Sequence, residues 1–196
     1  IDTNSINGRR SALIEGDKLI DFDLEFEGNN FQKGSIHKGK ITKIEGSLEA
    51  IFVEMGSSRH GFLPFKELSG EYFDPSKTGE DRFKISEGDD IVVQIQKEER
   101  VNKGAALSTY ISLASRYIVL MTNHPNGGGI SRRIHGEERD KIKSHIEALN
   151  VPENMSLIIR TAGIDKQIEE LRWDLEYLKK LWVEVDSAIK GSKATQ

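Results

Sequence analysis

The chain has 196 residues, of which 36% are apolar and 31% are charged, and its formal net charge is −4. This length and composition predict a globular chain with one or two domains, each with its own core. The absence of cysteine excludes disulfides and thiolate metal sites. The sequence has no run of about 18 apolar residues, so we expect no membrane-spanning helix. With no signal peptide visible either, we expect a cytoplasmic protein.

Charge is unevenly distributed along the chain. Residues 31–66 carry +3 and residues 91–134 carry +4, whereas residues 1–30, 67–90 and 135–196 carry −4, −5 and −2. Two basic segments that converge in a fold would favour a nucleic-acid backbone, because binding releases its counterions. Charge differences of this size also occur on ordinary solvated surfaces, so charge alone leaves both interpretations open.

Residues 9–27 have the pattern of a β-hairpin. The apolar run that ends at Ile14 is followed by the turn signal Glu15-Gly16-Asp17, and Leu24 and Phe26 then alternate with acidic residues. One face of this hairpin is therefore apolar and the other acidic. Because a lone hairpin is only marginally stable in water, we expect these strands to belong to a larger sheet.

The next part of the chain predicts a small barrel. Strand-like segments alternate here with glycine turns such as Gly46-Ser47 and Gly56-Ser57. An acidic surface excursion at 66–89 interrupts this series of segments. Five short antiparallel strands of this kind are typical of an OB-type barrel. The expected strands cover residues 34–44, 48–55, 58–65, 90–98 and 105–113.

Alternation predicts that two phenylalanines, Phe52 and Phe62, lie on the outer face of adjacent strands. Their strand neighbours are the better core candidates. Two outward rings would form a platform on which the bases of a single-stranded nucleic acid stack, and Lys38, Lys40 and Lys103 could rim it. Alternatively, both rings lie beneath the 66–89 excursion. The residues assigned to the interior are Ile51, Val53, Leu63 and Phe65, while His60 shares the outer face with Phe62.

After residue 115 the pattern changes to that of a small α+β region. We expect buried strands at 117–121 and 157–159, a flexible glycine-rich loop at 125–129 and an amphipathic helix at 136–149. A long helix at 165–190 carries an apolar heptad stripe, which either packs on the sheet of its own domain or forms a coiled coil. The stripe consists of Ile168, Leu171, Leu175, Leu178, Trp182, Val185 and Ile189.

Arg160 and Thr161 directly follow the predicted strand 157–159. An arginine fork beside a hydroxyl, with the glycine-rich loop nearby, could bind a phosphate group. The alternative is an ordinary solvated arginine at the end of a strand.

No catalytic constellation is recognisable in the sequence. The five histidines have no metal-ligand spacing, and there is no Walker motif, no GxSxG motif and no cysteine nucleophile. Acidic residues are numerous, but they lie in patterns typical of solvated surfaces, and we expect no metal site in this chain.

Five blocks of the sequence, in this order, resemble the ribonuclease E/G family of bacterial endoribonucleases. The resemblance extends over essentially the whole chain, and two of the blocks, RHGFLP and GGISRRI, favour the E branch. The blocks are SIHKGKITKIEGSLEAIFV (35–53), RHGFLP (59–64), KEERVNKGAAL (97–107), GGISRRI (128–134) and LIIRTAG (157–163).

The resemblance implies a domain organisation. Residues 1–32 would be the first strands of an RNase H-like subdomain, residues 33–116 an S1-type RNA-binding barrel, and residues 117–196 a 5′-sensor region that recognises a 5′-monophosphate. The family's nuclease domain, with its Mg²⁺-binding aspartates, and its cysteine zinc link would follow beyond this chain. The chain by itself would then be catalytically inert and bind no cofactor, and the parent protein would be a homotetramer.

The resemblance also implies roles for individual residues. Phe52, Phe62 and Lys103 match the family's RNA-contacting positions in the barrel. Arg160 and Thr161 match the phosphate-binding pair of the sensor, and Val119 matches a residue that lines the same pocket. Ser115 stands where the E branch commonly has a glycine. The resemblance therefore leaves open whether the backbone at this position contacts the phosphate.

The expected function is therefore single-stranded RNA binding and 5′-monophosphate sensing within an endoribonuclease of RNA processing and mRNA decay. Two alternatives remain at this point. The chain could be a stand-alone RNA-binding module, or an enzyme with an unrecognised carboxylate site.

Overall fold

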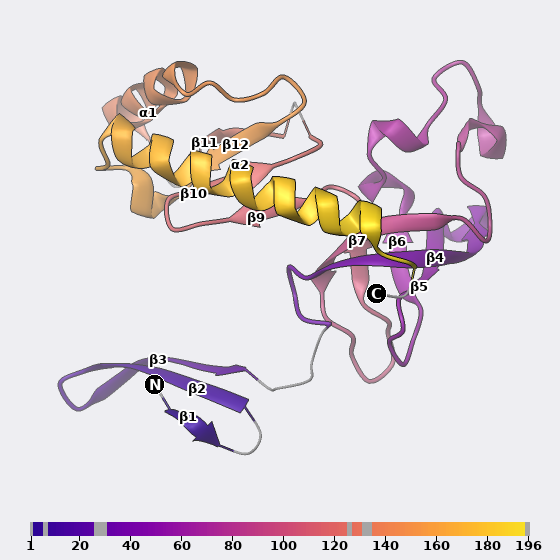
Figure 1. Ribbon diagram of the computed structural model, residues 1–196, viewed down its shortest axis with the longest axis horizontal. Coiled ribbons are helices and arrows are strands. Elements are labelled where there is room, and N and C mark those ends of the chain that lie inside the picture. The colour runs from indigo at the N-terminus through magenta and orange to yellow at the C-terminus, as the bar shows by residue number, and fades with distance from the viewer. Residues whose placement is uncertain (1, 6–7, 26–30, 125–126, 131–134, 195–196) are drawn as a thin grey trace. The chain divides into compact units, whose positions relative to one another are not determined.

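The computed structural model describes residues 2–5, 8–25, 31–124, 127–130 and 135–194 (Figure 1). The chain divides into two compact units, Ile1–Gln32 and Lys33–Gln196, and each is described by itself. Among the described residues, no helix is both long and apolar enough to cross a membrane.

The first unit is a three-stranded antiparallel sheet with strand order β1-β2-β3. The expected hairpin is formed by β2 and β3, whereas Phe26 and the rest of 26–30 lie outside the described residues. Ile14 and Leu19 face each other across this hairpin and are 62% and 56% exposed, so the unit leaves apolar surface uncovered. The strands are β1 (Asp2–Ser5), β2 (Gly8–Glu15) and β3 (Lys18–Glu25).

The second unit begins with a closed five-stranded barrel in the order β4-β5-β6-β8-β7. The expected barrel is therefore confirmed, although its strands are mostly shorter than the sequence pattern suggested. They are β4 (Ile36–Glu45), β5 (Ala50–Glu54), β6 (Gly61–Pro64), β7 (Asp90–Lys97) and β8 (Ala106–Ser108).

One strand pair of the barrel differs from the antiparallel arrangement expected. β6 and β8 run parallel, with Phe62 opposite Ala106, while the other four pairs are antiparallel. Strand direction cannot alternate all the way around a closed ring with an odd number of strands. A five-stranded barrel must therefore contain at least one parallel pair.

The segment predicted as one strand at 105–113 is divided between two sheets. Its first part is β8 of the barrel, and its last part is β9 (Ser112–Ala114) of the next sheet. Thr109, between them, takes its backbone partner from the excursion, where Glu67 O accepts the Thr109 N–H at 2.9 Å. Gln94 of β7 links the sheets by hydrogen bonds with the backbone of Ser112 in both directions.

The barrel interior follows the expected alternation with one exception. Ile51, Val53 and Leu63 are completely buried. Phe65, predicted to point inward, instead starts a 3-10 helix, Phe65–Glu67, and is only partly buried. The strand ends at Pro64, so the period of two no longer applies to Phe65.

Phe65 belongs to an aromatic cluster of the 66–89 excursion. Its ring lies 4.6 Å from that of Phe83, which in turn lies 5.4 Å from that of Phe73. The guanidinium of Arg82 lies 5.1–5.9 Å from all three ring centroids, a cation–π arrangement that holds the excursion together. Phe65, not the outward rings Phe52 and Phe62, therefore anchors this segment.

The rest of the second unit is a small mixed sheet, in the order β11-β12-β10-β9, with two helices. The expected strands and both expected helices are present, so the α+β class is confirmed. The elements are β10 (Ile118–Met121), β11 (Gly129–Ile130), α1 (Gly136–Ala148), β12 (Ser156–Ile159) and α2 (Ile168–Gly191).

The heptad stripe of α2 packs on this sheet, as one of the two interpretations predicted. Leu171, Leu175 and Leu178 are buried in one cluster with Ile118 and Ile159 of the sheet. The helix continues past the sheet towards β4 and β7 of the barrel (Figure 1). The helix α2 therefore contacts both the small sheet and the barrel of the second unit.

Candidate nucleic-acid interface

The rings of Phe52 and Phe62 form a pair on the outside of the barrel. The two residues are opposite each other in the β5–β6 register, and their ring centroids lie 5.9 Å apart in an edge-to-face arrangement. Both rings are half-buried, whereas their strand neighbours Ile51, Val53 and Leu63 are fully buried. Partly exposed rings on adjacent strands provide faces on which bases can stack.

His60 and Thr42 extend this surface at the start of β6. The hydroxyl of Thr42 donates to Phe52 O at 3.1 Å and lies 3.2 Å from His60 Nδ1. Thr42 is the extra residue of a β-bulge in β4, because Ile41 pairs with Val53 and Lys43 pairs with Phe52. The bulge therefore brings Lys43, which the sequence analysis did not select, directly opposite Phe52.

Lys103 lies on an exposed turn that is fastened to the same edge of the barrel. Arg100 and Lys103 exchange backbone hydrogen bonds of 2.9 and 3.1 Å, which close the turn. A Cβ atom on the next residue, Gly104, would lie 2.0 Å from His60 O, so only glycine allows this close approach. Ala105 O then accepts the Phe62 N–H at 2.8 Å. The turn that carries Lys103 is thus fastened to the strand that carries Phe62.

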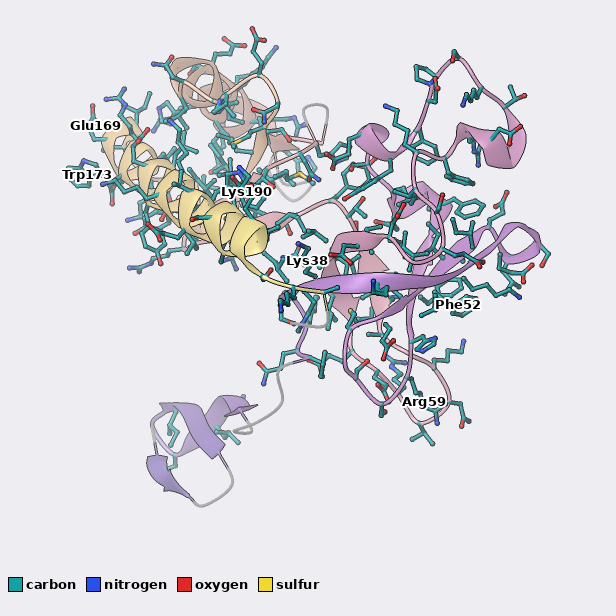
Figure 2. All side chains as sticks on the ribbon, turned by 45° about the vertical axis from the view of Figure 1, so that its right-hand side comes forward. Lys38, Phe52, Arg59, Glu169, Trp173 and Lys190 are labelled. Carbon is teal, nitrogen blue, oxygen red and sulfur yellow. The ribbon has the colours of Figure 1, made fainter. Side chains whose placement is uncertain are left out.

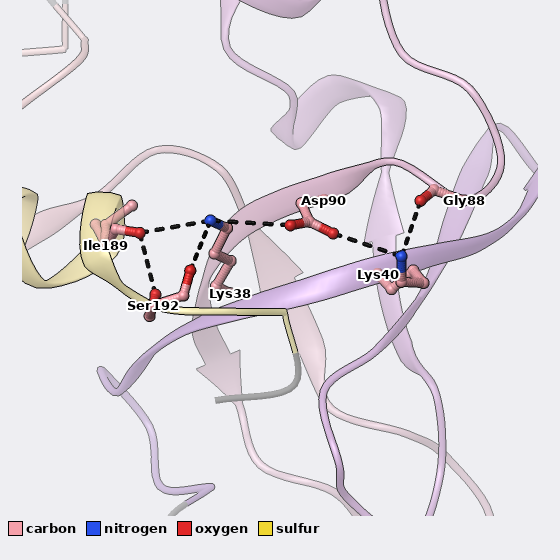
Figure 3. Close-up of polar contacts among 6 residues, drawn as sticks. All are labelled: Lys38, Lys40, Gly88, Asp90, Ile189 and Ser192. Carbon is pink, nitrogen blue, oxygen red and sulfur yellow. Dashed lines mark hydrogen bonds and ion pairs between the residues drawn. The ribbon is translucent and has the colours of Figure 1, made fainter.

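Lys38 and Lys40 are engaged elsewhere, contrary to the expectation that they rim the rings (Figure 3). Lys38 Nζ donates to Ser192 O at 3.0 Å and Ile189 O at 3.5 Å, at the end of α2. Both lysines also lie within 4 Å of Asp90, and Lys40 Nζ donates to Gly88 O at 3.2 Å.

The reason is the position of β4 between two strands. Lys38 lies opposite Val92 of β7, whereas the residue opposite Phe52 is Lys43, on the other side of the bulge. Figure 2 shows Lys38 near the end of α2 and Phe52 towards the other side of the barrel. Alternation alone could not predict which neighbouring strand each lysine would reach.

Lys43 is already paired in the structure. Its Nζ lies 2.6 Å from Glu45 Oε2, and Ser47 Oγ donates to the same carboxyl group at 2.7 Å. The hydrogen bond from Lys43, followed by that from Ser47, lowers the pKa of Glu45 to about 2. A phosphate bound by Lys43 would therefore compete with an ionised carboxylate.

The second candidate site lies where β12 ends. Arg160 is exposed, its Nη1 donates to Ser115 O at 2.6 Å, and its backbone N–H donates to Tyr117 O at 2.8 Å. Thr161 is also exposed and begins the 3-10 helix Thr161–Gly163. Three of the predicted phosphate-site residues, Ser115, Arg160 and Thr161, are therefore brought together.

Val119, the fourth predicted residue, lies on the neighbouring strand. It is half-buried and pairs with Ile158 of β12, the strand that leads directly into Arg160. The hydroxyl of Ser115 is not free, because it lies 2.5 Å from Asp174 Oδ2 and 3.0 Å from Ile118 O. The backbone of Ser115 is engaged too, because its N–H donates to Ile118 O at 2.9 Å and its carbonyl accepts from Arg160 Nη1.

Two further cations, Arg116 and Lys166, lie beside this site. Their charged groups lie 5.3 and 5.2 Å from the centroid of the Tyr117 ring. Lys166 also pairs with Glu170 at 3.4 Å, and a hydrogen bond with this carboxylate raises the pKa of Lys166, so the lysine is charged at neutral pH. The sequence patterns selected none of Arg116, Lys166 and Asp174. The one signal that could have found Asp174 is its position as a carboxylate between Leu171 and Leu175 of the apolar stripe.

The glycine-rich loop reaches the strand that carries Arg160. β11 runs parallel to β12, with Ile130 opposite Ile159. A Cβ atom on Gly128 would lie 2.8 Å from Leu157 O, so this approach also requires glycine. Pro125, Asn126 and residues 131–134, which belong to the predicted loop and the GGISRRI block, lie outside the described residues.

Within the described ranges, no group of three or more histidine, aspartate or glutamate side chains is arranged to hold a metal ion. The site geometry instead consists of a partly exposed aromatic pair with a nearby lysine, and a separate cationic corner built around Arg160.

A closed five-stranded barrel with paired outward rings defines a nucleic-acid-binding domain of the S1 class. In agreement, the S1 RNA binding domain matches residues 30–110, and the ribonuclease E/G family matches residues 112–196. The chain belongs to the ribonuclease E/G family.

Curated relatives carry the same family name. Ribonuclease E of Escherichia coli strain K12 is 50% identical over 189 residues, which cover 94% of this chain and 18% of that protein. Ribonuclease E of Haemophilus influenzae is 49% identical over 189 residues, covering 94% and 20%. Ribonuclease G of E. coli K12 is 32% identical over 184 residues, covering 90% and 37%. The chain thus spans about a fifth of the length of these ribonuclease E relatives and is more similar to them than to ribonuclease G.

Proposed function

We propose that this chain is the RNA-binding and 5′-end-sensing part of a bacterial endoribonuclease that acts in RNA processing and mRNA decay. Its barrel binds single-stranded RNA through Phe52, Phe62 and Lys103. The corner formed by Ser115, Val119, Arg160 and Thr161 recognises a 5′-monophosphate. The family membership and the S1 match support this assignment.

The observation that carries the sensing role is the arrangement of Arg160. Arg160 is exposed, yet the 2.6 Å hydrogen bond from Nη1 to Ser115 O restrains its guanidinium, and the exposed Thr161 follows it directly in the chain. An arginine whose orientation is set in advance loses less conformational entropy when it binds a phosphate, and its remaining N–H groups can donate to the phosphate oxygens.

The metals implied by the resemblance do not fit this chain. Zinc bound by cysteine is impossible here because the sequence has no cysteine, and the described residues hold no carboxylate cluster for Mg²⁺. We propose that Mg²⁺, Zn²⁺ and the contacts of a homotetramer belong to other parts of a longer cytoplasmic protein. Phosphodiester hydrolysis is then a property of that protein, and this chain alone does not cleave RNA.

The sensing role is tested by the affinity of the chain for two RNAs that differ only at the 5′ end. We expect a 5′-monophosphorylated RNA of about 12 nucleotides to bind more tightly than its 5′-hydroxyl counterpart in fluorescence anisotropy. Arg160→Ala should reduce this preference by about tenfold, because a charge-assisted hydrogen bond is lost. Arg172→Ala, which removes an exposed arginine from α2, is the matched control and should retain the preference. Equal binding of both RNAs by the wild type would contradict the proposal.

A stand-alone RNA-binding module is the second candidate, since the closed barrel provides a complete RNA-binding fold. Incubation of the chain with labelled RNA and Mg²⁺ distinguishes both candidate functions, the sensing part of an endoribonuclease and the stand-alone module, from an enzyme that acts by itself. Cleavage by the purified chain that disappears when a single carboxylate is replaced would contradict both candidates.

A further inference from the structure

Asp174 of α2 is the acceptor for three donors from the turn between β9 and β10. Its Oδ2 accepts the Ser115 hydroxyl at 2.5 Å, the Tyr117 N–H at 2.9 Å and the Ile118 N–H at 3.1 Å. These donors lie 56–59 residues away in the sequence. A single carboxylate oxygen thus holds this whole turn against the helix.

The opposite side of the same turn holds Arg160. The carbonyl groups of Ser115 and Tyr117 accept the Arg160 Nη1 and backbone N–H groups at 2.6 and 2.8 Å. Asp174 and Arg160 are therefore each hydrogen-bonded to Ser115 and Tyr117. A change in the turn would move the carbonyl group that orients the guanidinium.

We propose that Asp174 is a positioning residue for the 5′-phosphate site. It holds the turn 115–118 so that Ser115 O orients the guanidinium of Arg160 towards the ligand. This inference rests on the proposed sensing function for its consequence in RNA binding, although its structural part can be tested without RNA.

The chemistry of the contact explains why an aspartate stands at this position. A carboxylate beside a phosphate site repels the ligand unless its charge is compensated, and here three donors take up one of its oxygens. Hydrogen bonds to a charged acceptor are about twice as strong as those to a neutral one. An asparagine can still accept from the two backbone N–H groups, only more weakly, whereas an alanine cannot accept at all.

The structural part is tested by NMR of the free chain. In Asp174→Ala, we expect the Tyr117 and Ile118 amides to exchange with solvent at least about tenfold faster, since each loses its charged acceptor. We also expect the signal of the Arg160 Hη1 protons, whose nitrogen donates to Ser115 O, to lose its protection. Asp174→Asn should lie between alanine and wild type. Unchanged exchange at Tyr117 and Ile118, or an unchanged Arg160 signal in the alanine variant, would overturn the proposal.

The functional part is tested by the ratio of affinities for 5′-monophosphorylated and 5′-hydroxyl RNA. Asp174→Ala should bring this ratio close to one and leave 5′-hydroxyl binding by the barrel within twofold, whereas Asp174→Asn should restore part of the ratio. Glu169→Ala removes an exposed negative charge from the same helix and should change neither quantity. A ratio that survives in Asp174→Ala, despite faster exchange in the turn, would overturn the coupling to the phosphate site.

Two outcomes need a separate measurement. If the wild type shows no 5′ preference, the proposed sensing function fails, while the Arg160 signal still decides whether Asp174 orients that side chain. If Asp174→Ala does not fold, Ser115→Ala removes only one of the three donors. It should accelerate exchange at Ile118 and weaken the 5′ preference by a smaller factor, and no change in either would count against the proposal.

Discussion

At the scale of single residues, three phenylalanines close together in the chain have different surroundings. Phe52 and Phe62 face outward on paired strands, whereas Phe65 packs against Phe83 and beneath the guanidinium of Arg82. A ring that remains partly exposed at an energetic cost is a better candidate for ligand binding than one that anchors a loop.

Phe62→Ala should therefore weaken the binding of single-stranded RNA without unfolding the chain. The loss of one stacked base is worth about 1–3 kcal/mol, which corresponds to roughly 5- to 150-fold in affinity. Phe65→Leu is the control: it should lower the melting temperature and leave RNA affinity unchanged. If Phe62→Ala unfolds the barrel instead, the ring is part of the core and its assignment to the interface is wrong.

The Lys43–Glu45 pair predicts a defined dependence on pH. Interactions with Lys43 and Ser47 lower the pKa of Glu45 from its ordinary value of 4.5 to about 2. Because the folded pKa lies below the unfolded value, the pair stabilises the fold above about pH 4.5 and loses this effect as the pH falls towards 2. An NMR titration should give a Glu45 midpoint near 2, shifted towards 4.5 in Lys43→Met. A wild-type midpoint near 4.5 would show that the pair does not persist in solution.

At the scale of elements, α2 joins the two parts of the second unit. Its middle packs on the small sheet through Leu171, Leu175 and Leu178, and its last carbonyl groups accept from Lys38 of the barrel. A lysine at the C-terminal end of a helix satisfies carbonyl groups that have no partner within the helix and interacts favourably with the helix dipole.

Lys38→Met should destabilise the end of α2 and have little effect on RNA binding. The substitution keeps most of the aliphatic side chain and removes the charged donor, which should cost about 1 kcal/mol of unfolding free energy. Hydrogen exchange at residues 188–191 should rise. Lys190→Met removes a cation that pairs with Asp186 of the same helix, and should have a smaller effect. A tenfold loss of RNA affinity in Lys38→Met with α2 intact would instead support the direct RNA contact first expected.

At the scale of the whole molecule, the two compact units differ in architecture. The buried residues of the barrel and of the small sheet all belong to Lys33–Gln196. The first unit is a single three-stranded sheet that leaves Ile14 and Leu19 exposed. Sheets of this size are only marginally stable without a packing partner.

Residues 33–196 should therefore fold and bind RNA when produced without residues 1–32. We expect the melting temperature to change by no more than a few degrees, since a loss of about 1 kcal/mol would already shift it by about 2–4 °C in a domain of this size. The affinity for 5′-monophosphorylated RNA should be unchanged. Loss of RNA binding in the shorter chain would show that the first unit contributes to the site.

Local patterns in the sequence were sufficient for features that depend on a single element. Alternation placed Phe52 and Phe62 outside the barrel because neighbouring residues of a strand point to opposite faces. The heptad spacing identified the buried face of α2, and the position of Arg160 and Thr161 directly after a buried strand made them candidates for a phosphate site. Alternation failed at Phe65, where the strand had already ended.

Only the tertiary structure decided which distant residues meet. The parallel β6–β8 pair follows from closing a ring of five strands, and the bulge at Thr42 brings Lys43 instead of Lys38 to Phe52. Lys38 meets Ser192 across 154 residues, and Asp174 meets the turn at Ser115 across 59. Such contacts depend on how strands close and where a helix ends in space, and no periodicity within one segment records them.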